Sequence, residues 1–387
     1  MLFSVDAHAV GCHLTGNEVY ITNLLNQYAE LDGDADFIAY VSRPEAFDRL
    51  PARFRKIRVS DNPYLRLGFE LPRCLRRHRP DLLHVQYTAP LVASVPVVAT
   101  VHDVSFLEHP EYFTKFRAVQ LRITVKRTVR RAARILTPSE FSRRRIVNAY
   151  GVDESKVTVV PNGVSPVFRP VHAGAAAHWV RSRYNIPAPF VLTVGDLQPR
   201  KNHIRLIRAF EELLRAYPHL PHHLVMVGKE TWRAAGVRRA AARSAVADRL
   251  HFTGWVPDED LRYFYGACDL FVFPSLYEGF GIPIVEAMAC ARAVACSNTS
   301  AMPEVANAAA ILFDPESVAE IARAMRDLIL DAELRRRMER RGARRAALFS
   351  WSRAAQKTLD VYYDVAGVVR DAAPQPPRIP AARKLVR

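Results

Sequence analysis

The chain has few cysteines, and none lies in a pattern typical of metal binding. Five cysteines occur in 387 residues, without a Cys-x-x-Cys pair and without a Cys/His cluster at metal-ligand spacing. An odd, scattered set is typical of buried thiols in a reducing compartment, so we expect a cytoplasmic protein and no metal site. The five are Cys12, Cys74, Cys268, Cys290 and Cys296.

Long hydrophobic runs are also lacking. No stretch of about 18 apolar residues is present, so we expect no segment that spans a membrane. The first residues, 1–6, lack the basic segment and the long apolar core of a signal peptide. The hydrophobic fraction of 49% is typical of a globular protein, and the length favours two domains.

Lysine is scarce, although the chain is strongly basic. Only eight of the 55 basic residues are lysine, the formal net charge is +16, and the sequence pI is about 9.9. We attribute the arginine richness to a GC-rich genome. The excess positive charge still favours anionic partners such as nucleotide phosphates, anionic lipid head groups or nucleic acid.

Short apolar runs alternate with helical patterns along nearly the whole chain. Such alternation predicts an α/β fold of parallel strands covered by helices on both faces. The alternation restarts near residue 190, which predicts two doubly wound, Rossmann-like domains. The predicted strands are 2–5, 37–41, 82–86, 95–101, 134–137, 157–160, 190–194, 224–227, 250–252, 270–273, 293–296 and 311–313; predicted helices include 17–30, 112–131 and 140–150.

The domain boundary is predicted after the segment Pro161-Asn162-Gly163-Val164. The segment 165–188 is rich in proline, alanine and histidine and has weak periodicity until about His178. We therefore predict a first domain at 1–170, completed by a C-terminal helix at 352–368, and a second domain at 171–351. Four prolines and several basic residues predict a flexible tail at 369–387.

A glycine-rich turn separates two carboxylates, Glu278 and Glu286. The turn follows a buried strand pattern, and Pro283 suits the first turn of a helix after it. A helix N-terminus offers N–H groups to an anion, and carboxylates accept hydrogen bonds from hydroxyls. Phosphate together with many hydroxyls describes a nucleotide sugar. The alternative is an ordinary loop acid and a first-turn acid that stabilises the helix dipole.

A second turn, from Gly195 to Asn202, carries two adjacent cations between a strand and a helix. Arg200 and Lys201 together can neutralise a diphosphate and stabilise it as a leaving group. The alternative is an exposed basic turn in which Asn202 caps the following helix.

Polar residues also follow the strands of the first domain. His102 and Asp103 come after the predicted strand 95–101, and Gly16 lies in the turn after the first strand, where it permits close approach of a ligand. Ligands of open parallel sheets bind beyond the carboxyl ends of the strands, so we expect a cleft between the domains. The alternative is a structural histidine beside a turn-forming aspartate. The turn after the first strand lacks Gly-x-Gly-x-x-Gly, which argues against an NAD or FAD enzyme.

Basic residues concentrate between Lys115 and Arg145. Interleaved apolar residues give this stretch an amphipathic character suited to an anionic membrane surface; the alternative is a solvated helix face. We do not expect nucleic-acid binding, because no aromatic–basic recognition pattern accompanies the charge. The basic residues include Arg122, Lys126, Arg127, Arg130, Arg131, Arg134, Arg143, Arg144 and Arg145; the apolar ones are Leu121, Ile123, Val125 and Val129.

Together these segments resemble glycosyltransferase family 4, retaining transferases with the GT-B fold, and in particular its mannosyltransferase-like members. The resemblance covers about residues 5–360, and the Glu-x7-Glu element from Glu278 to Glu286 is its most specific part. The other parts are Thr15-Gly16-Asn17-Glu18, Val101-His102-Asp103-Val104-Ser105-Phe106, Thr137-Pro138-Ser139-Glu140-Phe141-Ser142, Val160-Pro161-Asn162-Gly163-Val164, Pro199-Arg200-Lys201-Asn202 and Glu278-Gly279-Phe280-Gly281.

The resemblance implies roles for the turns of the second domain. Glu278 would contact hydroxyls of the transferred sugar, Glu286 would bind the ribose, and Arg200 and Lys201 would clamp the diphosphate. The donor would also meet the backbone of Gly195, Gly279, Phe280, Gly281 and Ile282. Many members carry Gly-Arg where this chain has Gly195-Asp196, so Arg200 would take over the phosphate-binding role of that arginine.

In the first domain, the resemblance implies that His102, with Asp103 beside it, lies near the reacting sugar. Gly16 would let phosphates and acceptor approach. The closing helix, 352–368, would cross back to the first domain.

The reaction implied is retaining transfer of a hexose from a nucleotide diphosphate sugar, with GDP-mannose favoured over UDP-sugars. The acceptor would be a hydroxyl of a bacterial surface glycan, a lipid-linked oligosaccharide or a small molecule, with contact at the inner face of the plasma membrane. No Asp-x-Asp lies where a metal would bridge the diphosphate, so we expect neither metal nor further cofactor. The alternatives are a GT-B nucleotide-sugar epimerase and a non-catalytic binding protein on the same scaffold.

Overall fold

The computed structural model describes residues 1–12, 15–31, 35–231 and 233–368, in two compact units. The first unit comprises Met1–Gly163 and the segment that begins at Ser350; the second is Val164–Phe349. The division between Gly163 and Val164 lies in the predicted boundary segment 161–164, seven residues before the predicted limit of the first domain at 170. The predicted tail, 369–387, lies outside the described residues.

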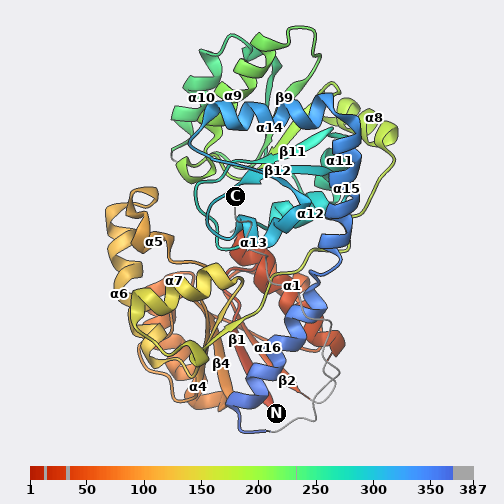
Figure 1. Ribbon diagram of the computed structural model, residues 1–387. Helices are drawn as coiled ribbons and strands as arrows, with labels where there is room; N and C mark the ends of the chain where they lie inside the picture. The colour runs from red at the N-terminus through yellow and green to blue at the C-terminus, as the bar shows by residue number, and fades with distance from the viewer. Residues whose placement is uncertain (13–14, 32–34, 232, 369–387) are drawn as a thin grey trace. The chain divides into compact units, whose positions relative to one another are not determined.

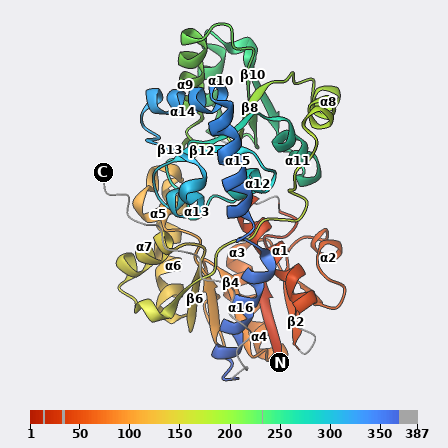
Figure 2. The ribbon, with the colours of Figure 1, turned by 45° about the vertical axis from the view of Figure 1, so that its right-hand side comes forward.

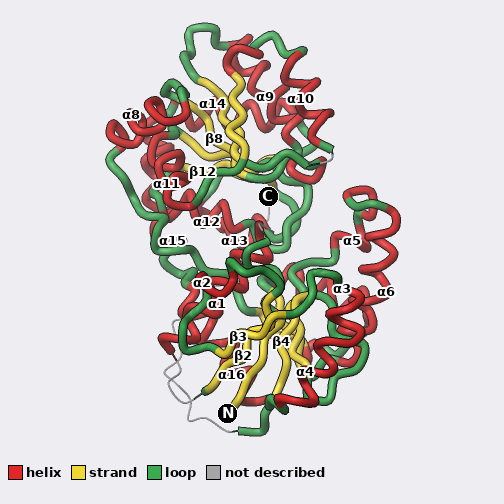
Figure 3. Tube along the Cα trace, turned by 180° about the vertical axis from the view of Figure 1, so that it is seen from behind, coloured by secondary structure: helices red, strands yellow, loops and turns green. Residues whose placement is uncertain are grey.

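The first unit is built on a seven-stranded sheet in the order β3-β2-β1-β4-β5-β6-β7. Every pair of neighbouring strands is parallel, and Figure 3 shows the strands lying between helices. The central strands carry buried apolar residues on both faces, as parallel sheets require. The strands are β1 Leu2–Asp6, β2 Asp36–Val41, β3 Arg55–Arg58, β4 Leu82–Gln86, β5 Val97–Thr100, β6 Arg134–Thr137 and β7 Val157–Val159.

The second unit repeats the design with a six-stranded parallel sheet in the order β10-β9-β8-β11-β12-β13. Buried apolar clusters cover both faces of this sheet. The strands are β8 Phe190–Val194, β9 His223–Val227, β10 Leu250–Gly254, β11 Leu270–Phe273, β12 Ala293–Ser297 and β13 Ile311–Phe313. Two doubly wound α/β units confirm the predicted fold class.

One strand was not predicted. β3 has the sequence Arg-Lys-Ile-Arg, which contains a single apolar residue, Ile57. It forms the edge of the first sheet and pairs only with β2, so its faces are not enclosed as those of central strands are. Strands are predicted from the pattern of hydrophobic residues that burial requires. An edge strand with one apolar residue has no such pattern and cannot be predicted in this way.

The helices of the first unit include the closing helix of the chain. α16, Trp351–Val365, packs along α1 and belongs to the first unit, which confirms the predicted return (Figures 1 and 2). The predicted helix 112–131 is shorter, because Thr114 caps a helix that begins at Lys115. The α-helices are α1 Thr15–Leu31, α2 Ala46–Arg49, α3 Pro63–Leu65, α4 Leu71–His78, α5 Ser105–Glu108, α6 Lys115–Arg131 and α7 Glu140–Tyr150.

The helices of the second unit flank its sheet. α14 packs against α9, and α8 packs against α11. No helix in the described part of the chain is both long and apolar enough to cross a membrane. The α-helices are α8 Ala173–Tyr184, α9 His203–Ala216, α10 Ala234–Ala242, α11 Asp258–Ala267, α12 Ile282–Ala289, α13 Met302–Ala306, α14 Val318–Leu330 and α15 Ala332–Ala346.

Strand order shows where each sheet can bind a ligand. In the second sheet the chain runs outward from β8 to β9 and β10, then returns to place β11 on the other side of β8. Crevices open at such switch points, beyond the carboxyl ends of the strands. The turns that follow β8 and β11 are the two turns singled out in the sequence, so both lie at this switch point.

Candidate functional site

The turns after β8 and β11 are joined by their backbones. Leu276 donates its amide hydrogen to the carbonyl oxygen of Arg200 at 2.8 Å. Arg200 and Lys201 lie in a short 3-10 turn, Pro199–Lys201, that leads into α9. This arrangement places both cations beside the residues that follow β11.

Glu278 lies between the two cations. Its Oε2 is 2.6 Å from Nη1 of Arg200, and its Oε1 is 2.7 Å from Nζ of Lys201. Arg200 also donates to the carbonyl oxygen of Tyr277 at 2.6 Å. The three predicted residues thus form one ion-pair cluster at the switch point.

Burial and charge act in opposite directions on Glu278. Burial alone would raise the pKa of its carboxyl group, but Arg200 and Lys201 more than offset that effect and lower the pKa to about 2. Burial lowers the pKa of the Lys201 ammonium group, and the Glu278 carboxylate opposes that shift. Only 10% of the Glu278 side chain and 12% of the Lys201 side chain are exposed, so solvent screens this pair weakly.

The backbone around Glu278 is fixed by residues that the sequence analysis did not single out. Ser300 accepts a hydrogen bond at Oγ from the Glu278 amide at 3.0 Å, and Ala301 donates to the Glu278 carbonyl at 3.3 Å. Thr299 donates from Oγ1 to the Leu276 carbonyl at 3.2 Å. These residues follow β12, and only the pairing of β12 with β11 brings them here.

Lys201 lies against a glycine and an aromatic ring. A Cβ atom on Gly195 would be 3.0 Å from Cε of Lys201, so glycine leaves room for the lysine stem. The ammonium nitrogen lies 4.6 Å from the centre of the Phe273 ring. A Cβ on Gly228 would lie 2.2 Å from the Gly195 carbonyl oxygen, so this second glycine, absent from our predictions, permits the close turn.

The alternative of an exposed basic turn capped by Asn202 is wrong. Asn202 precedes α9, but its side chain does not cap that helix. It is buried, and its amide nitrogen donates to the carbonyls of Pro274 at 3.1 Å and Pro315 at 2.7 Å. Asn202 therefore fastens the turn to the segments after β11 and β13.

The glycine-rich turn ends at the start of α12. Gly281 precedes the helix with a φ of 96°, in the left-handed region that favours glycine. Its Cβ would also lie 3.1 Å from Cδ1 of Ile284. Phe280 is buried, with its ring 5.5 Å from that of Phe349, so its side chain belongs to the core. Gly279 is buried as well, and Ile282 is half-buried at the first position of α12.

Glu286 lies further along α12, in a different environment. Tyr265 of α11 donates a hydrogen bond from its hydroxyl to Oε2 of Glu286 at 2.9 Å. Burial, reinforced by the charge of Asp258 at the start of α11, raises the pKa of Glu286 to about 8. Neither Tyr265 nor Asp258 was predicted, because nothing in the sequence near Glu286 indicates that α11 packs there.

In the first unit, His102 follows β5 and is held by Gln86 at the end of β4. Its Nε2 is 2.8 Å from Oε1 of Gln86, whose amide nitrogen donates to the carbonyl of Asn17 at 3.3 Å. Since an amide oxygen only accepts, His102 carries its proton on Nε2. Burial lowers the pKa of His102 to about 4, so its ring is neutral near pH 7 and Nδ1 is an acceptor.

Two tyrosines hold the His102 ring. The Tyr20 ring meets it edge-on at 4.7 Å between centres, and the Tyr87 ring lies at 5.6 Å. Tyr87 has a φ of 61°, a strained backbone conformation for an aromatic residue. Gln86 is the last residue of β4 and Tyr87 follows it, so a polar residue at the end of a predicted strand was the available sequence signal.

The other two predicted residues of the first unit have simple surroundings. Asp103 accepts at Oδ1 from the amide of Ser105 at 2.9 Å and from its hydroxyl at 2.6 Å, which is the turn-forming role given as the alternative. Gly16 is exposed in the first turn of α1, and a Cβ there would meet nothing within 4 Å.

The basic stretch divides into neutralised and unpaired cations. Arg134 is paired with Asp364 at 2.9 Å, Arg143 with Glu140 at 2.7 Å and Arg145 with Glu108 at 2.7 Å. Within the described ranges, Arg122, Lys126, Arg130 and Arg131 form no ion pair.

Three of the four apolar residues named in this stretch are buried, so they cannot contact a membrane surface. Leu121, Val125 and Val129 are buried in the core of the first unit, whereas Ile123 is exposed. The exposed apolar residues of α6 are Phe116, Val119 and Ile123 instead.

Among residues 1–12, 15–31, 35–231 and 233–368, no group of three or more His, Cys, Asp or Glu side chains could hold a metal ion.

Comparison with known proteins identifies both halves of the chain. Residues 14–168 match the family described as Glycosyltransferase Family 4, and residues 181–345 match Glycosyl transferases group 1. O-antigen chain mannosyltransferase B of Escherichia coli is 32% identical over 266 residues, which are 68% of this chain and 69% of that protein. The serotype-specific mannosyltransferase WbdA of Escherichia coli is 30% identical over 235 residues, 59% of this chain and 28% of that larger protein.

Solved structures share the fold over nearly the whole chain. Sucrose-phosphate synthase from Thermosynechococcus elongatus superposes with a TM-score of 0.77 at 21% identity, covering 95% of this chain and 99% of that one. Anabaena HepE in complex with UDP-glucose gives 0.76 at 20% identity, covering 94% and 99%. With two matching family profiles and a relative at 32% identity, the chain belongs to glycosyltransferase family 4 and is a glycosyltransferase of the GT-B fold.

Proposed function

We propose that this glycosyltransferase moves a hexose, with retention of configuration, from a nucleotide diphosphate sugar to an acceptor hydroxyl. The observation that carries the proposal is the cluster of Arg200, Lys201 and Glu278 at the switch point of the second sheet. The cluster brings two cations and one acceptor group together, as a phosphorylated and hydroxyl-rich donor requires.

The two cations would bind the diphosphate and stabilise it as it leaves. Together with Glu278 they carry a net charge of about +1 (two cations minus one carboxylate), so an attractive field remains for an anion. The weak exposure of the cluster strengthens each charge interaction, because little water screens it. Charge develops on the phosphate as the sugar bond breaks, and donors already in place stabilise it without reorganising.

The proposed chemistry needs no covalent enzyme intermediate. The bond from the sugar's anomeric carbon to the diphosphate oxygen breaks, and a bond to the acceptor oxygen forms on the same face. The acceptor proton passes to an oxygen of the leaving phosphate. Glu278 would hold sugar hydroxyls during the transfer. His102, through the lone pair on Nδ1, would accept from a hydroxyl near the reacting centre, with Asp103 holding the adjacent turn.

Glu286 would bind the ribose of the nucleotide. In its buried setting the carboxyl group, with a pKa of about 8, is largely protonated near pH 7 and can donate as well as accept. Tyr265 engages one of its oxygens. The Gly279–Gly281 backbone and the start of α12 would lie against the phosphate, because a helix N-terminus favours an anion.

For the donor we propose GDP-mannose first and UDP-hexoses second. The named relatives include mannosyltransferases, whereas the similar HepE structure contains UDP-glucose. A thermal-shift panel of GDP-, UDP-, ADP- and dTDP-sugars tests this choice. The true donor at 100 times its Kd should stabilise the protein by about 2.7 kcal/mol. If none of the panel raises the melting temperature, the proposed donor site is wrong.

Release of nucleoside diphosphate distinguishes transfer from epimerisation. A transferase should release it in proportion to glycosylated acceptor, which chromatography of both products measures. Interconversion of the donor sugar without acceptor would contradict transfer. An intact cluster that binds donor but never turns over would contradict catalysis.

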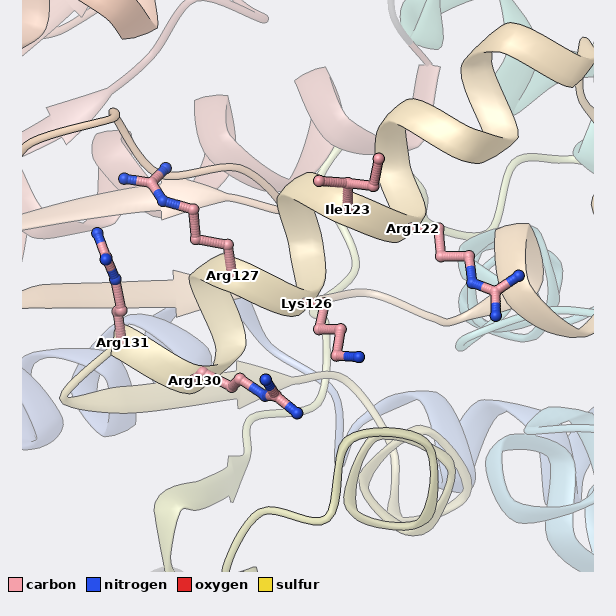
Figure 4. Close-up of a pocket in the computed structure, with 6 residues that line it drawn as sticks. All are labelled: Arg122, Ile123, Lys126, Arg127, Arg130 and Arg131. Atoms are coloured by element: carbon pink, nitrogen blue, oxygen red, sulfur yellow. The ribbon is translucent and has the colours of Figure 1, made fainter.

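The proposal includes a peripheral contact with an anionic membrane through α6. Figure 4 shows Ile123 and the cationic side chains that extend along this helix, which are Arg122, Lys126, Arg127, Arg130 and Arg131. Phe116, Val119 and Ile123 are exposed on the same helix. Apolar side chains beside cations suit the interface of an anionic bilayer. Replacing Arg130 and Arg131 by Glu should weaken binding to phosphatidylglycerol vesicles; unchanged sedimentation with those vesicles would remove this part.

A further inference from the structure

The first unit has an open groove between α5, α6 and α7. Its volume is about 370 Å³, within the range of small-molecule sites. Phe106 and Leu107 of α5 line one side, Val119 of α6 another, and Ala149 and Tyr150 of α7 the third. These side chains are apolar apart from the tyrosine hydroxyl, so the walls suit a hydrocarbon chain.

Two cations border the same groove. Arg122 and Lys126 are four residues apart on α6, and both line it. Figure 4 shows them extending to one side of α6, whereas Arg127 extends to the other, where it donates to the carbonyls of Pro90 and Leu91. In the described part of the chain neither Arg122 nor Lys126 has an acidic partner, so an anion at this edge would meet two available cations.

Tyr150 supplies an independent indication of a ligand. The residue is 9% exposed, and its hydroxyl oxygen is buried without a hydrogen-bond partner among the described residues. A hydroxyl that is buried without a hydrogen-bond partner is unfavourable, because it has lost its bonds to water. Because Tyr150 lines the groove, a polar atom of a bound molecule there can complete its hydrogen bond.

The groove is also joined to the candidate catalytic histidine. Phe106, which lines the groove, contacts the Tyr87 ring with centres 6.3 Å apart, and Tyr87 contacts the His102 ring. Glu108, the acidic residue of α5, is paired with Arg145 of α7, so its charge does not neutralise the two cations of α6. A ligand in the groove would thus have its anionic group near α6. The rings of Phe106 and Tyr87 would connect its site with His102.

We propose that this groove binds the lipid phosphate of a lipid-linked acceptor, with the chain between α5 and α7 and the phosphate between Arg122 and Lys126. The inference rests on the proposed function, whose acceptor class it names. Apolar walls alone would suit any hydrocarbon, and cations alone would suit any anion. Their combination in one groove, with a buried hydroxyl that lacks a partner, selects a molecule that has both parts.

The test measures binding of farnesyl phosphate, below its micellar concentration, to the full chain by calorimetry. Farnesol and inorganic phosphate are the two part-molecules. We expect each to bind at least about tenfold more weakly than farnesyl phosphate, because each forfeits one set of contacts. Farnesol binding as tightly, or phosphate alone accounting for the affinity, would overturn the proposal.

Two charge-matched variants separate the groove from general electrostatics. Arg122→Glu with Lys126→Glu should weaken farnesyl phosphate binding at least about tenfold. Arg76→Glu with Arg77→Glu makes the same change in charge at exposed positions of α4, in the same unit but outside the groove, and should alter that affinity by less than about threefold. Equal losses in the two variants would show that only the net charge matters and would overturn the proposal.

Two further variants test the space in the groove and the Tyr150 hydroxyl. Ala149→Trp fills the groove from an exposed position, so it should weaken binding about tenfold while leaving the unfolding temperature unchanged. Tyr150→Phe removes only the hydroxyl and should cost about threefold. Affinity that is unchanged in Ala149→Trp would contradict the site.

The donor panel keeps the two proposals apart. All groove variants should retain the wild-type thermal shift with the donor sugar. A wild-type protein that binds farnesyl phosphate but no nucleotide sugar would contradict the proposed function alone, whereas the reverse result would contradict the groove alone.

Discussion

The two glutamates of the Glu-x7-Glu element have the same exposure and opposite ionisation. Glu278 and Glu286 are each 8% exposed. Burial raises the pKa of both carboxyl groups, yet the final pKa is about 2 for Glu278 and about 8 for Glu286. The difference comes from neighbours: Arg200 and Lys201 lower the pKa of Glu278, whereas the charge of Asp258 raises that of Glu286 and the Tyr265 hydroxyl offsets only part of the rise.

One motif therefore holds two carboxyl groups with different ionisation states. An ionised Glu278 can only accept hydrogen bonds, and it holds two cations in place. A protonated Glu286 can donate to one hydroxyl and accept from another. Environments that shift the pKa values of two titratable groups in opposite directions are typical of functional sites.

The largest expected effect comes from Glu278→Gln. The substitution keeps the shape of the side chain but removes the charge that positions both cations, so we expect transfer to fall about 100- to 1,000-fold. Initial rates with donor and acceptor measure the loss. Glu316→Gln, on an exposed side chain of the same unit, is the matched control and should stay within about twofold of wild type. Near-normal turnover of Glu278→Gln would contradict the site.

The second prediction concerns stability in acid. Because the pKa of Glu278 falls from 4.5 to about 2 on folding, its ionised form contributes about 3 kcal/mol above pH 4.5, and this is lost as the pH falls toward 2. Urea unfolding of the wild type and of Glu278→Gln at several pH values measures this contribution to the free energy of unfolding. The two proteins should differ most near neutrality and converge in acid; a constant difference would contradict the assignment.

Glu286→Gln should behave in the opposite way. The pKa of Glu286 rises to about 8 on folding, so its contribution is complete below pH 4.5 and is lost as the pH rises through 8. Removing the titratable group should make the variant more stable than wild type at pH 9, on the order of 1–3 kcal/mol. Urea unfolding at pH 5 and pH 9 checks this, and a variant no more stable at pH 9 would show that Glu286 ionises freely.

The smallest effect is expected from Tyr265→Phe. The Tyr265 hydroxyl donates to Glu286 and so favours its charged form. Its loss should raise the pKa of Glu286 further, by less than about one pH unit, since one hydrogen bond is worth about 1 kcal/mol. NMR titration of the labelled glutamate carboxyl carbons measures the midpoint. Tyr263→Phe, on the same helix, is the control and should leave it unchanged.

Much of the fold could be predicted because buried strands and helix faces require apolar residues in recognisable patterns. The central strands β4 and β11 are buried at every position; β11 is apolar throughout and β4 has three apolar residues of five, which was enough to predict both. β3 was missed because an edge strand needs no such run. The exposed apolar residues of α6, Phe116, Val119 and Ile123, could not be told from the buried ones, because periodicity shows that a helix has an apolar face but not where that face ends.

The main residues of the candidate site could be predicted from the sequence, but many of the residues that contact them could not. Glu278, Arg200 and Lys201 were singled out from two separate turns, and strand order brings them together. Ser300 and Gly228 escaped notice, since a serine or a glycine after a strand has many ordinary explanations. Gln86 was not singled out either, because its role depends on β4 lying beside β5, which its local sequence does not indicate.

The α/β class, the repetition of the doubly wound pattern and the residue types for a phosphorylated, hydroxyl-rich ligand can all be predicted from the amino-acid sequence. They follow from local composition and spacing, which need no knowledge of distant neighbours. Three-dimensional packing, in contrast, sets which glutamate is ionised, which ring nitrogen of His102 carries the proton and which cations of α6 border a groove. Each depends on charges and donors far apart in the chain, and electrostatic and hydrogen-bond energies are set by distance in space.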